Sequence, residues 1–177
     1  MIKALAFLGV LDDGDVEWLV ANSKRQDLQS GSVLIRQGEP VGFLYLILDG
    51  AFNVTIPLPK EHQVARLYAG ELAGEMSFVD SHPPSATVTA GMPSRVLAIA
   101  GSDLAGKIEN DIGFASRFYK GISVILSDRL RAADNGSYSG EVDLRAAAEK
   151  ADLMETLTAR FEEIQRRLEL QGRATGA

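Results

Sequence analysis

Short β-rich segments separated by glycine turns follow one another between residues 26 and 100. Their regular spacing constrains the fold most strongly. The segments span 26–29, 32–36, 43–48, 51–56, 63–68, 85–90 and 95–100. Gly31, Gly38 and Asp49-Gly50 stand at breaks between them, and an Asp-Gly pair between two such runs predicts a hairpin. Strands this short and this regularly spaced are typical of a barrel or jelly roll, not of an open parallel sheet.

Helical patterns lie on both sides of the β-rich region. Asp12 can cap a helix whose apolar face is formed by Val16, Leu19 and Val20, and this helix should end near residues 22–23. Residues 4–11 form a short apolar run without a cleavage site, which favours a docked N-terminal helix over a signal peptide. After residue 103, apolar residues at spacings of three and four predict one helix over 104–133. Its length of about 45 Å exceeds what a small barrel needs, so we expect part of it to contact a partner.

The end of the chain has a different character. Residues 134–143 have the composition of a flexible linker, and residues 144–177 predict an amphipathic tail helix with a heptad seam of Met154, Leu157, Phe161, Ile164 and Leu168. Two interpretations of the tail remain open, a short coiled coil or docked helix and a frayed, solvated segment. The expected organisation is one domain over 1–133, a linker over 134–143 and a tail over 144–177.

Composition argues against several classes of function. The formal net charge is -6 and no basic block occurs, which argues against direct binding of nucleic acid. The absence of cysteine excludes disulfides and thiolate chemistry. No apolar run approaches the length of about 18 residues that crosses a bilayer, so we expect a soluble, cytoplasmic protein without membrane insertion. No serine lies in a nucleophile elbow and no carboxylate pair has a suggestive context, so we expect neither an enzyme nor a cofactor.

Metal binding is also not expected. His62 and His82 both lie in polar loops, where solvated imidazoles are the usual finding. Asp12, Asp13 and Asp15 resemble the start of a calcium loop, but the residues that follow lack the alternating oxygen ligands of such a loop.

One segment, residues 70–88, has the features of an anion site. Gly70 and Gly74 let the backbone turn tightly and approach a ligand, and residues 75–78 predict the first turn of a short helix whose N–H groups would face an anion. Pro83 and Pro84 end that helix, and residues 86–89 predict a new strand. A small anion would fit between the helix start and the strand start.

The order and spacing of these motifs closely resemble those of the cyclic nucleotide-binding domain family, including the effector domain of catabolite-activator-type regulators. The motifs are Gly31, Gly38-Glu39, Leu44 to Gly50, Gly70, Gly74-Glu75-Met76-Ser77 and Pro83 to Val88. The resemblance covers about residues 5–133. It implies a mainly β fold, an eight-stranded β-roll or jelly roll with flanking helices, in which segment 70–88 is the phosphate-binding cassette. The helix over 104–133 corresponds to the family's C-terminal helix, which often dimerises and lies over the base.

The resemblance also implies roles for individual residues. In relatives, the glutamate at the position of Glu75 binds the ribose 2′-hydroxyl, and the backbone around Met76 and Ser77 binds the cyclic phosphate. Taken without the family, Glu75 is equally explained as a first-turn carboxylate stabilised by the helix dipole. The implied ligand is cAMP or cGMP. The candidate ligand-binding set is Gly74, Glu75, Met76, Ser77, Pro84, Ser85 and Ala86.

The chain departs from the family pattern at Pro84. Family members that bind nucleotide usually carry arginine there, and this arginine pairs with the cyclic phosphate. A charge-assisted contact of that kind contributes about 1.5–3 kcal/mol, so its loss weakens binding some ten- to hundredfold if nothing replaces it. Backbone amides, the helix dipole and the Ser85 hydroxyl remain. The cations that could serve from elsewhere are Arg66, Arg95 and His82.

Two functions follow as hypotheses. The first is a regulatory module that senses cAMP or cGMP and relays binding through its C-terminal helices. The alternative is a degenerate, ligand-independent module for dimerisation or interaction. The presence of Pro84 in place of the usual arginine favours this alternative. In either case we expect a homodimer or a partner protein at 104–133 and 144–170. A DNA-binding regulator is disfavoured, because the residues after 133 are few and not basic and lack two helices around a glycine turn.

Overall fold

The computed structural model describes residues 5–57, 62–134, 158–159 and 161–166. The described residues of 21–110 form one compact unit, and the described residues of 5–20 and 111–166 form a second. Among the described residues, no helix is long and apolar enough to cross a bilayer.

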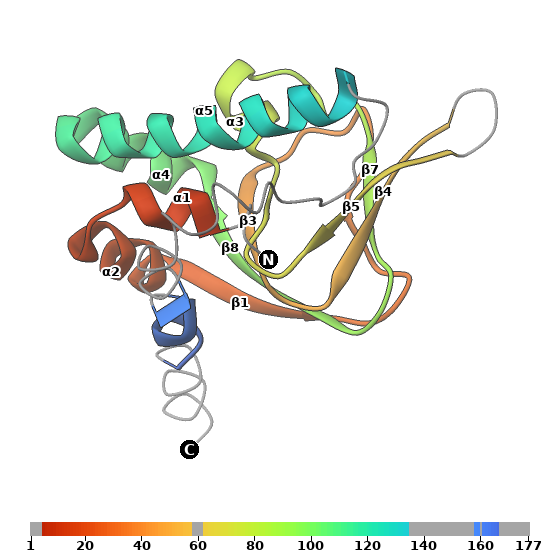
Figure 1. Ribbon diagram of the computed structural model, residues 1–177, viewed down its shortest axis with the longest axis horizontal. Helices are drawn as coiled ribbons and strands as arrows, with labels where there is room; N and C mark the ends of the chain where they lie inside the picture. The colour runs from red at the N-terminus through yellow and green to blue at the C-terminus, as the bar shows by residue number, and fades with distance from the viewer. Residues whose placement is uncertain (1–4, 58–61, 135–157, 160, 167–177) are drawn as a thin grey trace, which may run out of the picture. The chain divides into compact units, whose positions relative to one another are not determined.

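The first unit is built from two antiparallel four-stranded sheets (Figure 1). The strand order is β1-β8-β3-β6 in one sheet and β2-β7-β4-β5 in the other. This arrangement confirms the predicted mainly β fold of eight strands with flanking helices. The strands are β1 (Ser23–Leu28), β2 (Val33–Ile35), β3 (Phe43–Asp49), β4 (Ala51–Ile56), β5 (His62–Tyr68), β6 (Leu72–Ala73), β7 (Thr87–Ala90) and β8 (Ser94–Ala100).

An apolar cluster draws on strands of both sheets and forms the core of the roll. Side chains of a strand alternate between its two faces, so every second residue of β3 can enter this cluster. Tyr45 and Ile47 do so, and Val96 and Ala98 enter it from β8. The other sheet contributes Ile35, Phe52, Leu67, Val88 and Ala90.

The hairpin predicted at Asp49-Gly50 is wrong. β3 pairs with β8 and β6, whereas β4 pairs with β5 and β7. Both edges of β3 are therefore occupied, and the chain turns a corner into the other sheet instead of folding back. Gly50 has φ of +88°, and a Cβ there would lie 2.2 Å from Ser94 Oγ, so only glycine fits this corner.

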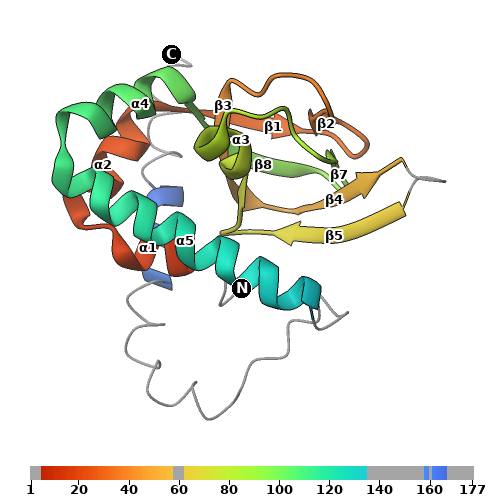
Figure 2. The same cartoon turned by 90° about the horizontal axis from the view of Figure 1, so that it is seen from above.

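The first unit also contains two helices. α3 (Glu75–Asp80) follows β6 and lies beside β3 (Figure 2). α4 (Gly101–Asn110) follows β8 directly. The Gly101 N–H donates to the Gly42 carbonyl at 2.8 Å, which fixes the start of α4 against the chain that leads into β3.

The second unit contains α1 (Leu5–Val10), α2 (Asp13–Ala21) and α5 (Ile112–Asp134). The expected docked N-terminal helix is confirmed: α1 packs on α5 (Figure 2), with the rings of Phe7 and Phe118 5.6 Å apart and edge to face. Gly121 permits this approach, since a Cβ there would lie 2.7 Å from Phe7 Cδ2.

The predicted Asp12 cap is confirmed. The Asp15 N–H donates to Asp12 Oδ1 at 2.9 Å, and the Asp12 N–H donates to Asp15 Oδ2 at 3.0 Å. This reciprocal pair is a capping box. Val16, Leu19 and Val20 are buried as expected, and the helix ends at Ala21, just before the predicted position.

A continuous helix over 104–133 is wrong, because the chain forms α4 and α5 with a break at Asp111. Asp111 Oδ1 accepts a hydrogen bond from the Phe114 N–H at 2.9 Å, and its carbonyl accepts one from the Ala115 N–H, also at 2.9 Å. Asp111 is therefore the N-cap of a new helix. A short acidic side chain that bonds the backbone of the next turn competes with continuation of the preceding helix.

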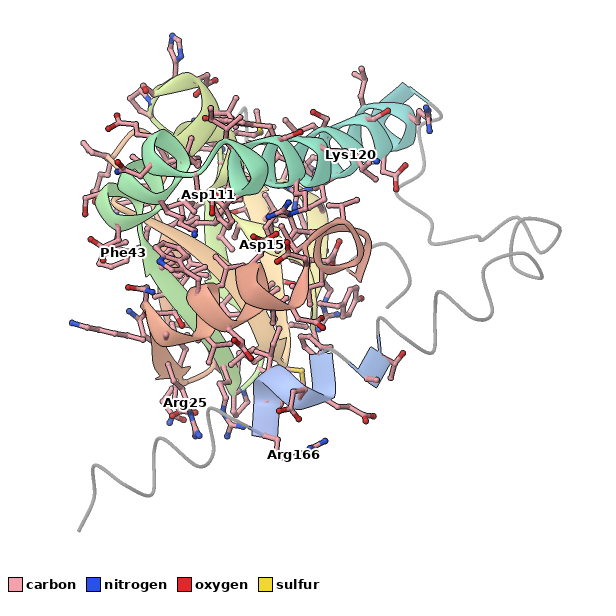
Figure 3. All side chains as sticks on the ribbon, turned by 90° about the vertical axis from the view of Figure 1, so that its left-hand side faces the viewer. Asp15, Arg25, Phe43, Asp111, Lys120 and Arg166 are labelled. Carbon is pink, nitrogen blue, oxygen red and sulfur yellow. The ribbon has the colours of Figure 1, made fainter. Side chains whose placement is uncertain are left out.

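An ion pair joins α2 to α5. Arg117 Nη2 donates to Asp15 Oδ1 at 2.8 Å and lies 2.9 Å from Asp12 Oδ2. Asp15 is only 3% exposed, on the side of α2 that faces α5 (Figure 3). Burial alone would raise the pKa of Asp15, but hydrogen bonds from Arg117 and from the Asp12 backbone, with the charge of Arg117, lower it below 3.8.

The predicted linker over 134–143 lies outside the described residues except for Asp134, as does most of the tail over 144–177. The described tail residues, 158–159 and 161–166, are helical. Ile164, a member of the predicted seam, is buried, and Glu163 pairs with Arg166 at 2.7 Å. The domain boundaries, and the choice between a docked and a solvated tail, stay predictions.

Candidate functional site

The first half of the candidate site is the turn from β6 into α3. Gly74 has φ of +90° and is the N-cap of α3. A Cβ at this position would lie 2.8 Å from the Phe43 carbonyl oxygen and 3.4 Å from Val41 Cγ1. Glycine is therefore required at this position for two reasons: the left-handed backbone conformation and the close approach of β3. Because glycine has no side chain, the N-cap makes no side-chain hydrogen bond to the first turn of α3.

The residues after Gly74 differ sharply in exposure. Glu75 is 2% exposed, whereas Met76 is 51% exposed and Ser77 is half-buried. Within the described ranges, no fully buried side-chain nitrogen or oxygen lacks a hydrogen-bond partner. The turn thus holds the carboxylate of Glu75 inside the protein and leaves the apolar Met76 side chain at the surface.

The second half of the candidate site is the chain between α3 and β7. Ser81 ends α3 in the left-handed conformation with φ of +58°, and its N–H donates to the Ser77 carbonyl at 3.0 Å. The Pro84 carbonyl accepts a hydrogen bond from the Gly38 N–H at 2.9 Å, and Thr87 Oγ1 accepts one from the Gln37 N–H at 3.1 Å. The turn at residues 37–38 therefore positions the segment from Pro84 to Thr87, which includes Ser85 and Ala86.

Ile35 connects the two halves. Its Cδ1 lies 3.6 Å from the position of a Cβ on Gly74, and its backbone is paired in register with Val88 of β7. The start of α3 and the start of β7 are thus both close to the end of β2. The structure brings the predicted residues 74–77 and 84–86 into one region of the roll.

The three residues that could replace the missing arginine, Arg66, Arg95 and His82, each contact another part of the chain. Arg66 Cζ lies 5.6 Å from the centroid of the Tyr68 ring. Arg95 Nε donates to Asp27 Oδ1 at 3.0 Å, and His82 is largely exposed with Nδ1 2.9 Å from the Asp80 carbonyl oxygen. None of these contacts involves residues 74–77 or 84–86.

Arg36 is a further cation, which sequence reasoning did not consider, although its place directly before the Gln37-Gly38 turn could have drawn attention to it. It lies 3.3 Å from Glu39 Oε1 and is exposed. Arg36 directly follows β2, and Ile35, the last residue of that strand, belongs to the core cluster. The ion pair of Arg36 is with Glu39 and involves none of residues 74–77 or 84–86.

Comparisons with known proteins agree with this geometry. The family model described as cyclic nucleotide-binding domain matches residues 25–111. A cyclic nucleotide-gated potassium channel of Mesorhizobium japonicum is 29% identical over 85 residues, which are 48% of this chain and 22% of the channel. A cGMP-dependent protein kinase of Eimeria tenella is 34% identical over 83 residues, 47% of this chain and 8% of the kinase. The chain spans less than a third of the length of the curated relatives it matches.

A solved structure extends the likeness to most of the chain. The crystal structure of a cyclic nucleotide-binding domain from Methylobacillus flagellatus has a TM-score of 0.68 and 23% identity, covering 80% of this chain and 86% of that one. The β-roll, the turn at Gly74 and the matched segment lead to the same conclusion. Residues 25–111 of this chain belong to the cyclic nucleotide-binding domain family.

Proposed function

We propose that this domain senses cAMP or cGMP at the site formed by residues 74–77 and 84–86. The observation that carries the proposal is Gly74, whose left-handed backbone and contact with Phe43 set the start of α3 and bury the carboxylate of Glu75. The names of two relatives, a cyclic nucleotide-gated channel and a cGMP-dependent kinase, indicate the class of ligand.

Each residue has a role that its chemistry permits. The Glu75 carboxylate accepts a hydrogen bond from a ribose hydroxyl, and the N–H groups of Met76 and Ser77 donate to the cyclic phosphate. The Ser85 hydroxyl and the Ala86 N–H approach from the other side. Pro84 supplies no charge, so the phosphate is held by neutral donors, and we expect binding some ten- to hundredfold weaker than with arginine.

Binding must change the helices to act as a signal. A ligand shifts a conformational equilibrium only as far as it binds one state more tightly than the other. The chain leaves the β-roll through α4, and Asp111 then begins a separate helix, α5. We place the relay at this break between α4 and α5, with a homodimer or a partner protein receiving it at α5 and the tail.

Isothermal titration of cAMP and of cGMP tests the proposal. The wild type should bind with micromolar affinity, and Pro84→Arg should bind about ten- to hundredfold more tightly. Pro83→Arg is the matched control, because it adds the same charge one residue away at an exposed position and should leave the affinity unchanged. A wild type that takes up neither nucleotide contradicts the proposal.

The second candidate function is a ligand-independent interaction module. It is favoured by Pro84, which supplies no charge for a phosphate. It is also favoured by the contacts that Arg66, Arg95 and His82 make with Tyr68, Asp27 and Asp80 instead of with the candidate site. It predicts no heat from the wild type, binding by Pro84→Arg, and an oligomeric state that sedimentation shows to be the same with and without nucleotide.

A further inference from the structure

Tyr45 is a polar residue inside an otherwise apolar cluster. It lies on β3, is 8% exposed and packs with the aliphatic side chains that fill the roll. Its neighbours across the sheet are Ala73 on β6 and Ala98 on β8. Both of these neighbours have small side chains.

The Tyr45 hydroxyl has no hydrogen-bond partner in the part of the chain that the structure describes. In the same part, no fully buried side-chain oxygen is without a partner. The hydroxyl must therefore keep some contact with solvent, although the ring is buried. Buried tyrosines usually find a partner for their hydroxyl, and a buried polar group without one is costly. This oxygen is thus available to an incoming ligand.

The open end of the roll lies on the side of Gly74. Along the interior face of β3, exposure falls from 39% at Phe43 to 8% at Tyr45 and 0% at Ile47. Phe43 and Tyr45 share this face, with ring centroids 6.1 Å apart. The Phe43 carbonyl is also the group that a Cβ on Gly74 would strike. Tyr45 therefore stands between the closed core and the end where α3 begins.

Residues on three other strands point to the same place. Ala73, the register partner of Tyr45, directly precedes Gly74. Ile35 belongs to the same cluster as Tyr45 and approaches Gly74 from β2. Ile35 is also paired in register with Val88, two residues after Ala86. The side chains around Tyr45 are thus those that lie beneath both halves of the candidate site.

We propose that Tyr45 is a ligand-binding residue whose hydroxyl donates a hydrogen bond to an oxygen of the nucleotide held at residues 74–77 and 84–86. This inference rests on the proposed function. With Pro84 in place of a cation, a neutral donor inside the roll has more to contribute than it would beside an arginine. Burial raises the pKa of Tyr45, so the phenol keeps its proton throughout the neutral range.

Tyr45→Phe tests this assignment, because it removes the hydroxyl and keeps the ring and its packing. Tyr68→Phe is the matched control, since Tyr68 is an exposed tyrosine on β5 of the same roll. Both changes are made in the wild type and in Pro84→Arg, and cAMP and cGMP are titrated into all of them. We expect Tyr45→Phe to weaken binding about tenfold and Tyr68→Phe to leave it within about twofold. Thermal melting of each variant verifies the fold.

The outcomes separate this inference from the proposed function. If only Pro84→Arg binds nucleotide and Tyr45→Phe weakens that binding, the sensing function of the wild type fails while the role of Tyr45 stands. If Tyr45→Phe binds as tightly as its parent in every background that binds, the role of Tyr45 is overturned. If no background binds either nucleotide, both proposals fall.

Discussion

Replacing Gly74 with alanine tests the close approach on which the candidate site depends. The added Cβ would lie 2.8 Å from the Phe43 carbonyl oxygen, at a residue whose φ is +90°. The left-handed backbone costs a non-glycine residue about 1–2 kcal/mol. Overpacking against a backbone atom that cannot swing aside adds about 1–3 kcal/mol. We therefore expect a loss of about 2–5 kcal/mol in the free energy of unfolding, out of the roughly 5–15 kcal/mol typical of a domain.

Gly38→Ala is the matched control for this change. Gly38 also has a positive φ, +77°, but nothing lies within 4 Å of a Cβ built on it. It should lose only the conformational part, about 1–2 kcal/mol. Urea unfolding followed by circular dichroism gives both values, provided that the m-value does not change. Equal losses at the two positions would refute the reasoning, because the contact with Phe43 would then contribute nothing.

Three further predictions concern the helices. Asp15→Asn removes the carboxylate that binds Arg117 and should cost about 2 kcal/mol at neutral pH. Because the folded pKa of Asp15 lies below the usual 3.8, the wild type keeps this stability above pH 3.8 and loses it as the pH falls through the folded pKa. Asp111→Ala removes the N-cap of α5 and should cost about 1 kcal/mol. Gly121→Ala should destabilise by about 1–2 kcal/mol despite the better helix propensity of alanine, because its Cβ would overlap α1. The control for Gly121→Ala is Gly106→Ala in α4, which should stabilise by about 1 kcal/mol, since its Cβ would enter open space.

Urea unfolding checks all three predictions, and each has an outcome that contradicts it. Asp27→Asn is the control for Asp15, because Asp27 also has a lowered pKa but its ion pairs are exposed and should contribute at most about 1 kcal/mol. A larger loss at Asp27 than at Asp15 would show that burial is not what makes the pair with Arg117 important. A fully stable Asp111→Ala variant would remove the reason given for the helix break. Gly121→Ala as stable as Gly106→Ala would contradict the packing of α1 on α5.

Local chemistry allowed much of the fold to be predicted, because the relevant signals lie within a few residues. The Asp12 cap depends on residues three positions away, and the strand β3 is indicated by five consecutive apolar residues, Leu44 to Leu48. Most strands were therefore predicted nearly in place. The first residues of β1 were not, because Ser23, Lys24 and Arg25 belong to an exposed edge strand that has no apolar signal.

Features set by distant residues could not be predicted from local patterns. The Asp49-Gly50 turn has the residue types of a β-hairpin. However, β3 pairs on its two edges with β8 and β6, which come later in the chain. Apolar residues recur at helical spacing both before and after Asp111. This spacing predicted one continuous helix and gave no sign of the break. In the candidate site, Gly74 could be predicted to be needed as glycine. Tyr45 could not be identified from the sequence, because a tyrosine within an apolar run is also typical of an ordinary core position in a strand.

The most direct test of the central claim is an NMR titration of the ¹⁵N-labelled wild-type chain with cAMP and with cGMP, observed at each backbone amide. We expect saturable shifts in the micromolar range, largest at the amides of Met76, Ser77 and Ala86, because these N–H groups hold the phosphate in the absence of an arginine, and at Glu75, whose carboxylate binds the ribose. No saturable shift at these amides, or shifts confined to other parts of the chain, would contradict the claim that this cassette binds a cyclic nucleotide.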